Sequence, residues 1–404
     1  MISYKRHTFY AITFFFIAAT MGLLLRTAQV FPMGFNYRFV VHAHSHVALM
    51  GWIHLALMTL IVYHFLNTHI PKNKYLRIFW VTMISVIGML ISFPFQGYAV
   101  FSIIFSSLFL IISYFFAYVV FKYTPKEEKK KASFKTLKWA LIFMIISSIG
   151  PWSVGGIMAT LGPSSHWYRT SIYLYLHFQY NAWIILGVIA IIIKLIEKDG
   201  NTINSKMFNS FILYFNISSF LTMFISVLYT EPPYLYFLLA VIGSLLQLFS
   251  TYYLYKIIVE HLDWFKNKFL KLGRRLLIWA FILFVLKSMM QLTGSFPETA
   301  KIIAQNNYLA IGFLHLIFLG VVSLSILALF QKASWIKISN LAIQTFIMGF
   351  AFTEIIIFYR PAVKILGFPN SPNYDIFLFI ASIFLVIGIA MILFRMIRIR
   401  IELK

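Results

Sequence analysis

The chain has 404 residues, of which 61% are hydrophobic and 11% are charged, and its mean hydropathy is +0.85. This composition is far from that of a soluble globular protein and predicts an all-α, polytopic membrane protein. The 34 Lys and Arg residues outnumber the 11 Asp and Glu residues and give a net charge of +23. In a membrane protein such an excess belongs to cytoplasmic loops and lipid headgroup contacts, so we expect no nucleic-acid partner. The lack of cysteine excludes disulfides, covalently attached haem, iron–sulfur clusters and thiolate-bound copper within this chain.

Twelve segments are long and apolar enough to cross a membrane, which takes about 20 residues. The first follows a short basic stretch and has no small-residue cleavage site after it, so we interpret it as a retained span. The segments leave no room for a soluble domain, and we predict a single transmembrane domain over residues 1–404. They cover residues 9–25, 39–66, 75–95, 98–121, 137–159, 171–193, 207–229, 234–255, 276–292, 308–330, 336–359 and 374–396.

The Lys and Arg residues fall almost entirely on one side of this scheme. The N-terminal stretch, the even-numbered loops and the C-terminal stretch carry 27 of the 34, whereas the odd-numbered loops carry 6. Because positive residues accumulate in cytoplasmic loops, this asymmetry predicts twelve spans with both termini in the cytoplasm. We therefore expect a multi-pass protein of a bacterial cytoplasmic membrane, surrounded by the lipid bilayer.

Three histidines at alternate positions, His42, His44 and His46, open the second segment. Imidazole is costly in hydrocarbon unless it binds a metal or forms hydrogen bonds, so the cluster predicts coordination of a haem or a metal. His42 and His46 are four residues apart and share a helix face, while His44 points about 200° away. The triplet can therefore serve a haem on one side and a second metal or a hydrogen-bonded partner on the other.

Two more histidines lie at a similar depth in segments that run in the same direction. His177 is in the sixth segment and His315 is in the tenth, and at about 1.5 Å per residue both lie roughly 10 Å inside. A six-coordinate haem takes its two axial ligands from opposite faces of the ring, so one helix cannot supply both. Histidines from three segments at one level predict a shared haem or metal site.

This arrangement resembles subunit I of the haem-copper oxidase superfamily, which includes nitric oxide reductases. The string from Ala43 to Val47 and the following Gly51-Trp52 resemble the second span of that family. The resemblance implies an oxidoreductase or electron-transfer protein that acts in oxygen or nitric oxide chemistry. It also implies a quinol or a cytochrome as electron donor, and additional membrane subunits as partners.

The resemblance further implies the roles of single histidines. A haem b would lie between the second and tenth spans, with His315 as one axial ligand and His44, or else His46 or His42, as the other. His177 would belong to a copper or other transition-metal site. His44, His46 and His315 are candidate metal ligands as well as candidate haem ligands.

Two departures from the family limit what we expect. The seventh segment has no histidine, whereas the family has an adjacent pair there. The tenth segment has His315 alone, whereas the family has two histidines two residues apart. We therefore expect no complete oxygen-reducing centre and assign no catalytic residue. One haem remains, with a degenerate metal site built from His177 and a spare member of the triplet.

Charged residues at the outer side complete the candidate set. Arg38 and Arg360 are placed to hold haem propionates, which guanidinium binds through paired hydrogen bonds. Glu354 lies about one turn from the outer end of the eleventh segment, where it could bind a metal, carry protons or pair with an arginine. Lys287 is the charged residue inside the ninth segment.

Two alternatives stay open at this point. His42-Ala43-His44 also resembles the His-Ala-His near the start of a span in the NnrS family, whose members are associated with haem, copper and nitric oxide stress. A protein of another class, a transporter for a transition metal or a small molecule, could use the same histidines to bind its ion directly.

Overall fold

The computed structural model describes residues 2–162, 164–367, 369 and 371–402, and these residues form helices and connecting turns without a β-strand. Twelve helices of the described chain are long and apolar enough to cross a membrane, as the sequence predicts. Their bounds are Tyr4–Val30, Tyr37–Leu66, Lys72–Gln96, Val100–Tyr123, Ala132–Thr160, His166–Lys198, Ser205–Thr230, Tyr234–Glu260, Lys271–Thr293, Asn307–Lys332, Asn340–Val363 and Tyr374–Arg398. We call the helix ends that the Lys and Arg distribution assigns to the outside the predicted outer ends.

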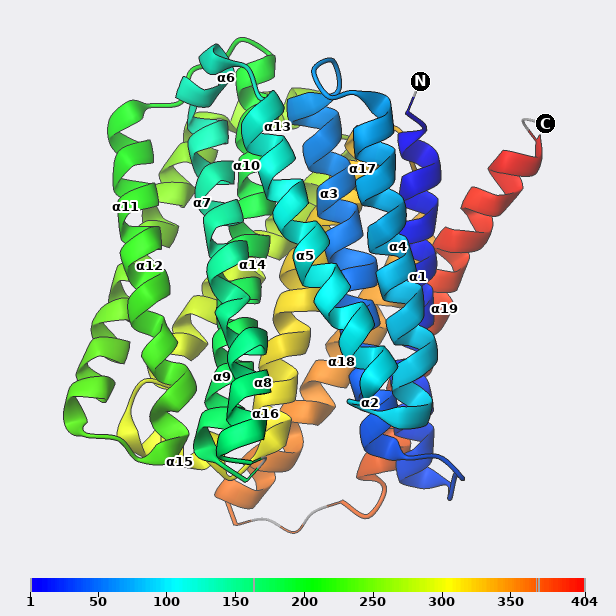
Figure 1. Ribbon diagram of the computed structural model, residues 1–404, viewed down its shortest axis with the longest axis vertical. Helices are drawn as coiled ribbons and strands as arrows, with labels where there is room; N and C mark the ends of the chain where they lie inside the picture. The colour runs from blue at the N-terminus through cyan, green and yellow to red at the C-terminus, as the bar shows by residue number, and fades with distance from the viewer. Residues whose placement is uncertain (1, 163, 368, 370, 403–404) are drawn as a thin grey trace. The chain divides into compact units, whose positions relative to one another are not determined.

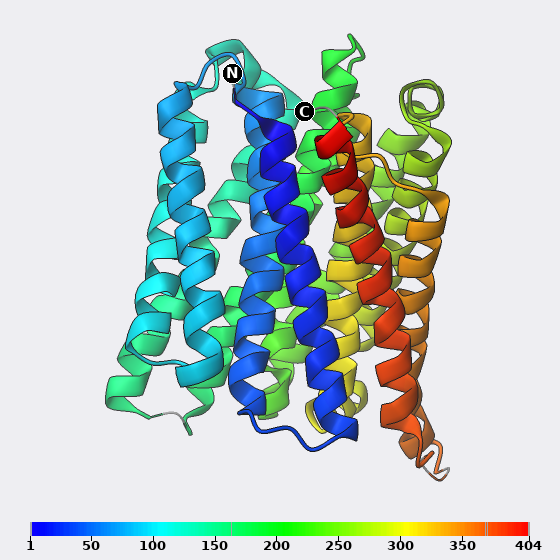
Figure 2. The same cartoon turned by 90° about the vertical axis from the view of Figure 1, so that its right-hand side faces the viewer.

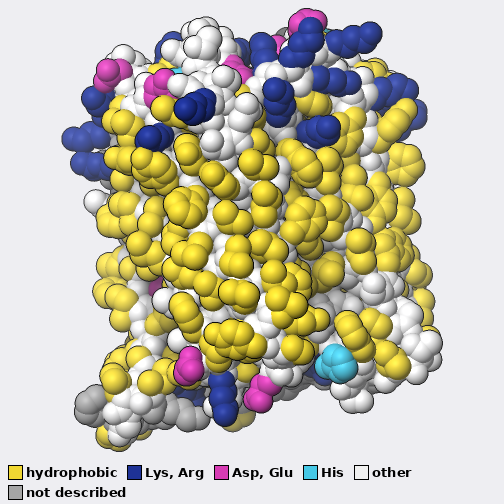
Figure 3. Space-filling model, turned by 90° about the vertical axis from the view of Figure 1, so that its left-hand side faces the viewer, with side chains coloured by type: hydrophobic (Ala, Val, Ile, Leu, Met, Phe, Trp, Pro, Cys, Tyr) yellow, Lys and Arg dark blue, Asp and Glu magenta, His cyan; other side chains and the backbone are white. Residues whose placement is uncertain are grey.

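The surface has the character of a protein immersed in lipid. Large hydrophobic side chains such as Phe95 and Tyr234 are 83% and 75% exposed. On the face shown in Figure 3, hydrophobic side chains form a broad band and most Lys and Arg gather at one end of it. A helix satisfies its own backbone hydrogen bonds, which is why helices of this length can cross a hydrocarbon layer. The structure is that of a polytopic membrane protein.

The chain divides into two compact units. Unit 1 consists of Met1–Tyr123 and Ile326–Lys404, and unit 2 consists of Thr124–Ser325. The elements of unit 1 are α1 (Tyr4–Val30), α2 (Tyr37–His46), η1 (Val47–His54), α3 (Leu55–Ile61), η2 (Val62–Leu66), α4 (Lys72–Gln96), α5 (Val100–Tyr123), most of α17 (Leu324–Lys332), α18 (Asn340–Ile365) and α19 (Tyr374–Glu402).

In unit 1 the last helix of the chain packs against the first. Helix α19 packs along α1, so that the first and last helices of the chain lie side by side (Figure 2). Helices α18 and α19 form an antiparallel pair held close by Gly349 and Gly388. A Cβ atom at Gly349 would lie 2.5 Å from the backbone nitrogen of Leu385, and one at Gly388 would lie 2.6 Å from that of Phe346. Small residues of this kind allow membrane helices to approach closely.

Unit 2 contains the central part of the chain, drawn in green and yellow in Figure 1. Helices α11 and α12 form a hairpin, and α14 packs against α12. The elements are α6 (Lys126–Lys130), α7 (Ala132–Ser147), α8 (Ile149–Thr160), α9 (His166–Phe178), η3 (Gln179–Trp183), α10 (Ile184–Lys198), α11 (Ser205–Leu221), η4 (Thr222–Thr230), α12 (Tyr234–Glu260), α13 (Leu262–Lys268), α14 (Lys271–Thr293), α15 (Pro297–Ala304), α16 (Asn307–His315) and η5 (Leu316–Ser323).

Three of the twelve spans differ from the others in burial and in helix type. In the most apolar stretch of Tyr37–Leu66, His166–Lys198 and Asn307–Lys332, 89%, 89% and 72% of the residues are buried, against 33–50% in the other nine. The same three spans contain the π-helical turns of the described chain, η1, η2, η3 and η5. Short π-helical segments inside α-helices are frequent at functional sites. These three spans are also the ones that carry the candidate histidines.

Candidate functional site

His44 points from α2 towards α1. Its Nδ1 atom lies 2.8 Å from the carbonyl oxygen of Ala18. Because a carbonyl oxygen can only accept, Nδ1 carries the ring proton and Nε2 keeps its lone pair. Within the described part of the chain, no residue forms a hydrogen bond with that Nε2 atom. His44 therefore has the tautomer and the available nitrogen of a metal-binding histidine, whose other nitrogen is usually held in this way.

Gly22 makes this position of the His44 ring available. A Cβ atom on Gly22 would lie 3.1 Å from Cε1 of His44, closer than most contacts of a Cβ atom. The glycine therefore allows the imidazole to lie directly against α1, where it reaches the Ala18 carbonyl. Helix α1 fixes the ring by one hydrogen bond and one close contact.

His42 and His46 face a different neighbour, as their spacing predicts. The Nδ1 atom of His46 donates to the carbonyl oxygen of His42 over 2.8 Å, and the hydroxyl of Tyr98 lies 3.2 Å from Nε2 of His46. The rings of both histidines contact Phe93 and Tyr98. Since both nitrogens of His46 have partners, His44 is better placed than His46 to offer a lone pair to a metal.

Two charged side chains accompany His44 in unit 1. Arg26 on α1 is 9% exposed and lies within electrostatic range of both His44 and Glu354. Glu354 on α18 is 8% exposed. The sequence pattern missed Arg26, because α1 continues five residues beyond the predicted end at residue 25 and brings this arginine inside the helix. Extending the predicted first span beyond residue 25 would have placed Arg26 inside the helix and identified it as a candidate.

The two arginines predicted to hold propionates have different surroundings. Arg38 lies exposed in the first turn of α2. Arg360 on α18 lies 3.5 Å from a carboxylate oxygen of Asp375 and stacks over the ring of Tyr374, 4.7 Å from its centroid. Arg360 therefore joins α18 to α19, and Asp375 is its partner in unit 1.

His177, in unit 2, is 1% exposed and has partners on both ring nitrogens. Its Nε2 atom donates to the carbonyl oxygen of Ser219 over 2.8 Å, and its Nδ1 atom accepts from the amide of Asn181 at 3.0 Å. These bonds join η3 and α9 to α11. A metal could bind His177 only if one of them were broken, so the metal role of His177 stays a prediction.

Each group of candidate histidines directly precedes a π-helical segment. The triplet is followed by η1, His177 by η3, and the half-buried His315 by η5. In the described residues, no group of three or more His, Asp or Glu side chains is arranged to hold a metal ion. The triplet belongs to unit 1, and His177 and His315 belong to unit 2. The predicted pairing of a triplet histidine with His315 stays a prediction.

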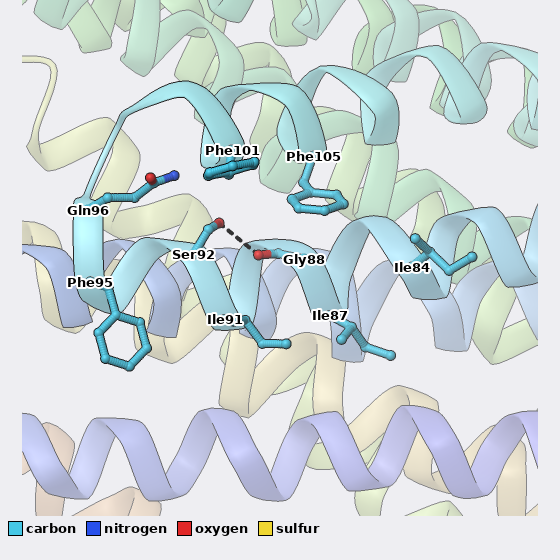
Figure 4. Close-up of a pocket in the computed structure, with 9 residues that line it drawn as sticks. All are labelled: Ile84, Ile87, Gly88, Ile91, Ser92, Phe95, Gln96, Phe101 and Phe105. Atoms are coloured by element: carbon cyan, nitrogen blue, oxygen red, sulfur yellow. Dashed lines mark hydrogen bonds between the residues drawn. The ribbon is translucent and has the colours of Figure 1, made fainter.

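A groove on the outside of unit 1 contains none of these candidates. It lies between α4 and α5, has a volume of about 470 Å³ and is lined mainly by apolar side chains, including Ile91, Phe95 and Phe101 (Figure 4). The hydroxyl of Ser92 donates to the carbonyl oxygen of Gly88 within its own helix (Figure 4). This groove has the chemistry of a surface for lipid chains and offers no group for catalysis or metal binding.

Comparison with models of known protein families finds no match to the chain. Comparison with curated protein sequences likewise finds no significant relative.

Proposed function

We propose that this chain is a haem-binding integral membrane protein of a bacterial cytoplasmic membrane, with one haem b. His44 is the axial ligand from the second span, and His315 is the ligand that the sequence favours from the tenth. The observation that carries the proposal is the fixed orientation of His44, whose Nε2 lone pair remains available while Nδ1 is held by the Ala18 carbonyl. An imidazole held in this way is prepared for iron at no further cost in ordering.

The surrounding residues supply the rest of a haem site. A bound haem would provide one-electron transfer or binding of a diatomic gas such as oxygen or nitric oxide. Arg26 is a buried guanidinium close to His44 and can hold a propionate, the role expected from sequence for Arg38 and Arg360. Glu354 can accept a hydrogen bond or a proton at the same end of unit 1. The electron donor is a quinol or a cytochrome.

The absorption spectrum of the detergent-purified protein tests this proposal. With haem supplied during expression, we expect a Soret band that shifts on reduction, and a pyridine haemochromogen spectrum typical of haem b at about one per chain. A colourless preparation that contains stoichiometric copper or zinc would contradict the proposal and support a metal-binding or transport protein. A preparation with haem and copper together would favour the NnrS-like alternative.

His315 is tested separately from His44. The variant His315→Ala should lose the low-spin spectrum of a bis-histidine haem, because one axial position would be left without imidazole. His64→Ala is a matched control, since His64 is near the other end of the second span. If His315→Ala keeps the full wild-type spectrum, the second ligand is another residue and the proposed pair is wrong.

A further inference from the structure

Lys287 in unit 2 has no role in the proposed function. It lies on α14 and its side chain is fully buried, with 0% exposure. Within the described residues, its ammonium nitrogen has no hydrogen-bond partner, and it lies 5.7 Å from the centroid of the Phe284 ring. A charged residue inside a membrane-spanning helix is costly and usually marks a pathway or a binding site. The cation–π contact alone offsets a small part of that cost.

Two buried glutamines lie on the same pair of packed helices as Lys287, Gln291 on α14 and Gln247 on α12. A hydrogen bond of 2.9 Å between the hydroxyls of Ser244 on α12 and Ser295, two residues after the end of α14, joins the two elements. Gln247 comes three residues after Ser244 on α12, and Gln291 comes four residues before Ser295 on α14. Because the two helices are antiparallel, we infer that Gln247 and Gln291 lie at a similar depth in unit 2. Lys287 follows one turn below Gln291, on the same face of α14. The amide nitrogen of Gln247 and the amide oxygen of Gln291 are buried and lack hydrogen-bond partners in the described chain.

The neighbouring helices extend this polar region. The hydroxyl of Ser218 on α11 lies 3.0 Å from the amide oxygen of Gln247. The next residue, Ser219, accepts the hydrogen bond from His177, and Lys287 lies within electrostatic range of that histidine. Buried polar groups without partners cost about 1–3 kcal/mol each in proteins. An unpaired amide N–H, an unpaired amide oxygen and an ammonium group are therefore buried on two neighbouring helices of unit 2.

Unit 2 provides no negative charge at this depth to balance Lys287. The carboxylates of its described residues lie near helix ends or in connecting segments; they are Glu127, Glu128, Glu197, Asp199, Glu231, Glu260, Asp263 and Glu298. Lys194, another buried lysine of the unit, shows the contrast, because it forms an ion pair with Glu128. A buried charge without a counter-ion is strongly destabilising.

We propose that Lys287 and Gln247 form a binding site for a small monovalent anion of the size of chloride or nitrite. The ammonium of Lys287 supplies the balancing charge, and the unpaired amide N–H of Gln247 donates a hydrogen bond. Lys287 is six residues from the end of α14 at Thr293, or about 9 Å along the helix. The predicted outer end of α14 is therefore the nearer end from which an anion would enter. This site is independent of the haem.

Thermal unfolding of the full-length protein in detergent tests the anion site. Tm is measured at one ionic strength in sodium gluconate, whose anion is much larger than chloride or nitrite, and in sodium chloride and sodium nitrite. Wild-type Tm should be higher in chloride or nitrite by roughly 2–5 °C, because a ligand that binds the folded state stabilises it. Lys287→Met should abolish this increase. Lys194→Met, which removes the lysine paired with Glu128, should lower Tm in every salt. Its Tm should still be higher in chloride or nitrite than in gluconate.

A second variant tests the geometry if Lys287→Met does not fold. Gln247→Glu places a carboxylate where the anion is expected, so it should raise Tm in gluconate and remove the response to chloride and nitrite. The proposal is overturned if wild-type Tm is the same in all three salts, or if Lys287→Met or Gln247→Glu responds to the anions as the wild type does.

Discussion

His44 in unit 1 and His177 in unit 2 are both held by a backbone carbonyl of a neighbouring helix, but through opposite ring nitrogens. His44 donates from Nδ1 to Ala18, and the described chain leaves its Nε2 atom without a hydrogen bond. His177 donates from Nε2 to Ser219, and its Nδ1 atom accepts from Asn181. The first arrangement leaves a lone pair available to a metal, whereas the second uses the ring to join helices. Two histidines that look equivalent in sequence are thus prepared for different tasks.

The largest effect expected from this difference is the loss of haem in His44→Ala. Without the second-span imidazole, the haem content per purified chain should fall at least tenfold, since ligands and the groups that orient them each affect metal affinity by about 10–100-fold. The Soret absorbance at equal protein concentration measures this. His42→Ala is the control, because that ring lies on the opposite face of α2. An equal loss of haem in both variants would contradict the distinction between the two faces.

Gly22→Leu should have the next largest effect. The new side chain would occupy the space of the His44 ring, because a Cβ atom alone already comes within 3.1 Å of it. The ring would lose its hydrogen bond to Ala18, and haem occupancy should fall severalfold or the Soret band should shift. Gly155→Leu is a matched control on α8, since nothing lies within 4 Å of a Cβ atom there. A normal spectrum for Gly22→Leu would mean that the orientation of His44 does not control binding.

His177→Ala should affect stability rather than haem. The substitution removes two buried hydrogen bonds and leaves the Ser219 carbonyl and the Asn181 amide without their partner. We expect the free energy of unfolding to fall by about 1–3 kcal/mol. Denaturant or thermal unfolding in detergent measures this change. Haem and copper content per folded chain should stay at the wild-type value. If either falls in the folded variant, His177 is a ligand and the comparison with His44 fails.

Glu128 gives the smallest expected effect, at the predicted cytoplasmic end of unit 2. Burial alone would raise its pKa, but the hydrogen bonds from Lys131 and Lys194 outweigh burial and hold the pKa below the ordinary 4.5. A lowered carboxylate pKa contributes stability above pH 4.5, and this contribution is lost as the pH falls through the folded-state pKa. Glu128→Gln should therefore lower stability by about 0.5–1 kcal/mol at neutral pH and much less near pH 3.

The control for Glu128 is its neighbour. Glu127 pairs only with Lys130 across the surface of α6, and both side chains are more than 70% exposed. At each pH between 3 and 7, Glu127→Gln should have the same Tm as the wild type, because exposed ion pairs contribute little to stability. A similar pH dependence in both variants would show that the bond between Glu128 and Lys194 does not stabilise unit 2.

Much of the fold could be predicted from the sequence. Twelve apolar segments became twelve helices, because transfer of about 20 apolar residues into hydrocarbon is a local property of each segment. The divergence of His44 from His42 and His46 also followed from helix geometry. The ends of the helices were less predictable, and the extension of α1 beyond residue 25 is why Arg26 was missed.

The candidate site was predictable only in part. The sequence singled out the histidines and predicts their depth, but the residues that hold them are far away in the chain. Ala18 lies 26 residues from His44, and Ser219 lies 42 residues from His177. The π-helical turns after the histidines and the contact of Gly22 with His44 have no local sequence signature that we could use.

The sequence by itself determined that this is an all-helical membrane protein with histidines clustered in its second span, because hydrophobic transfer and helix periodicity act residue by residue. The tertiary structure decided which nitrogen of His44 is occupied, which arginine lies beside it, and that the ammonium of Lys287 has no hydrogen-bond partner among the described residues. These properties depend on the backbone atoms and charges that other helices bring within a few ångströms, and local patterns do not encode them.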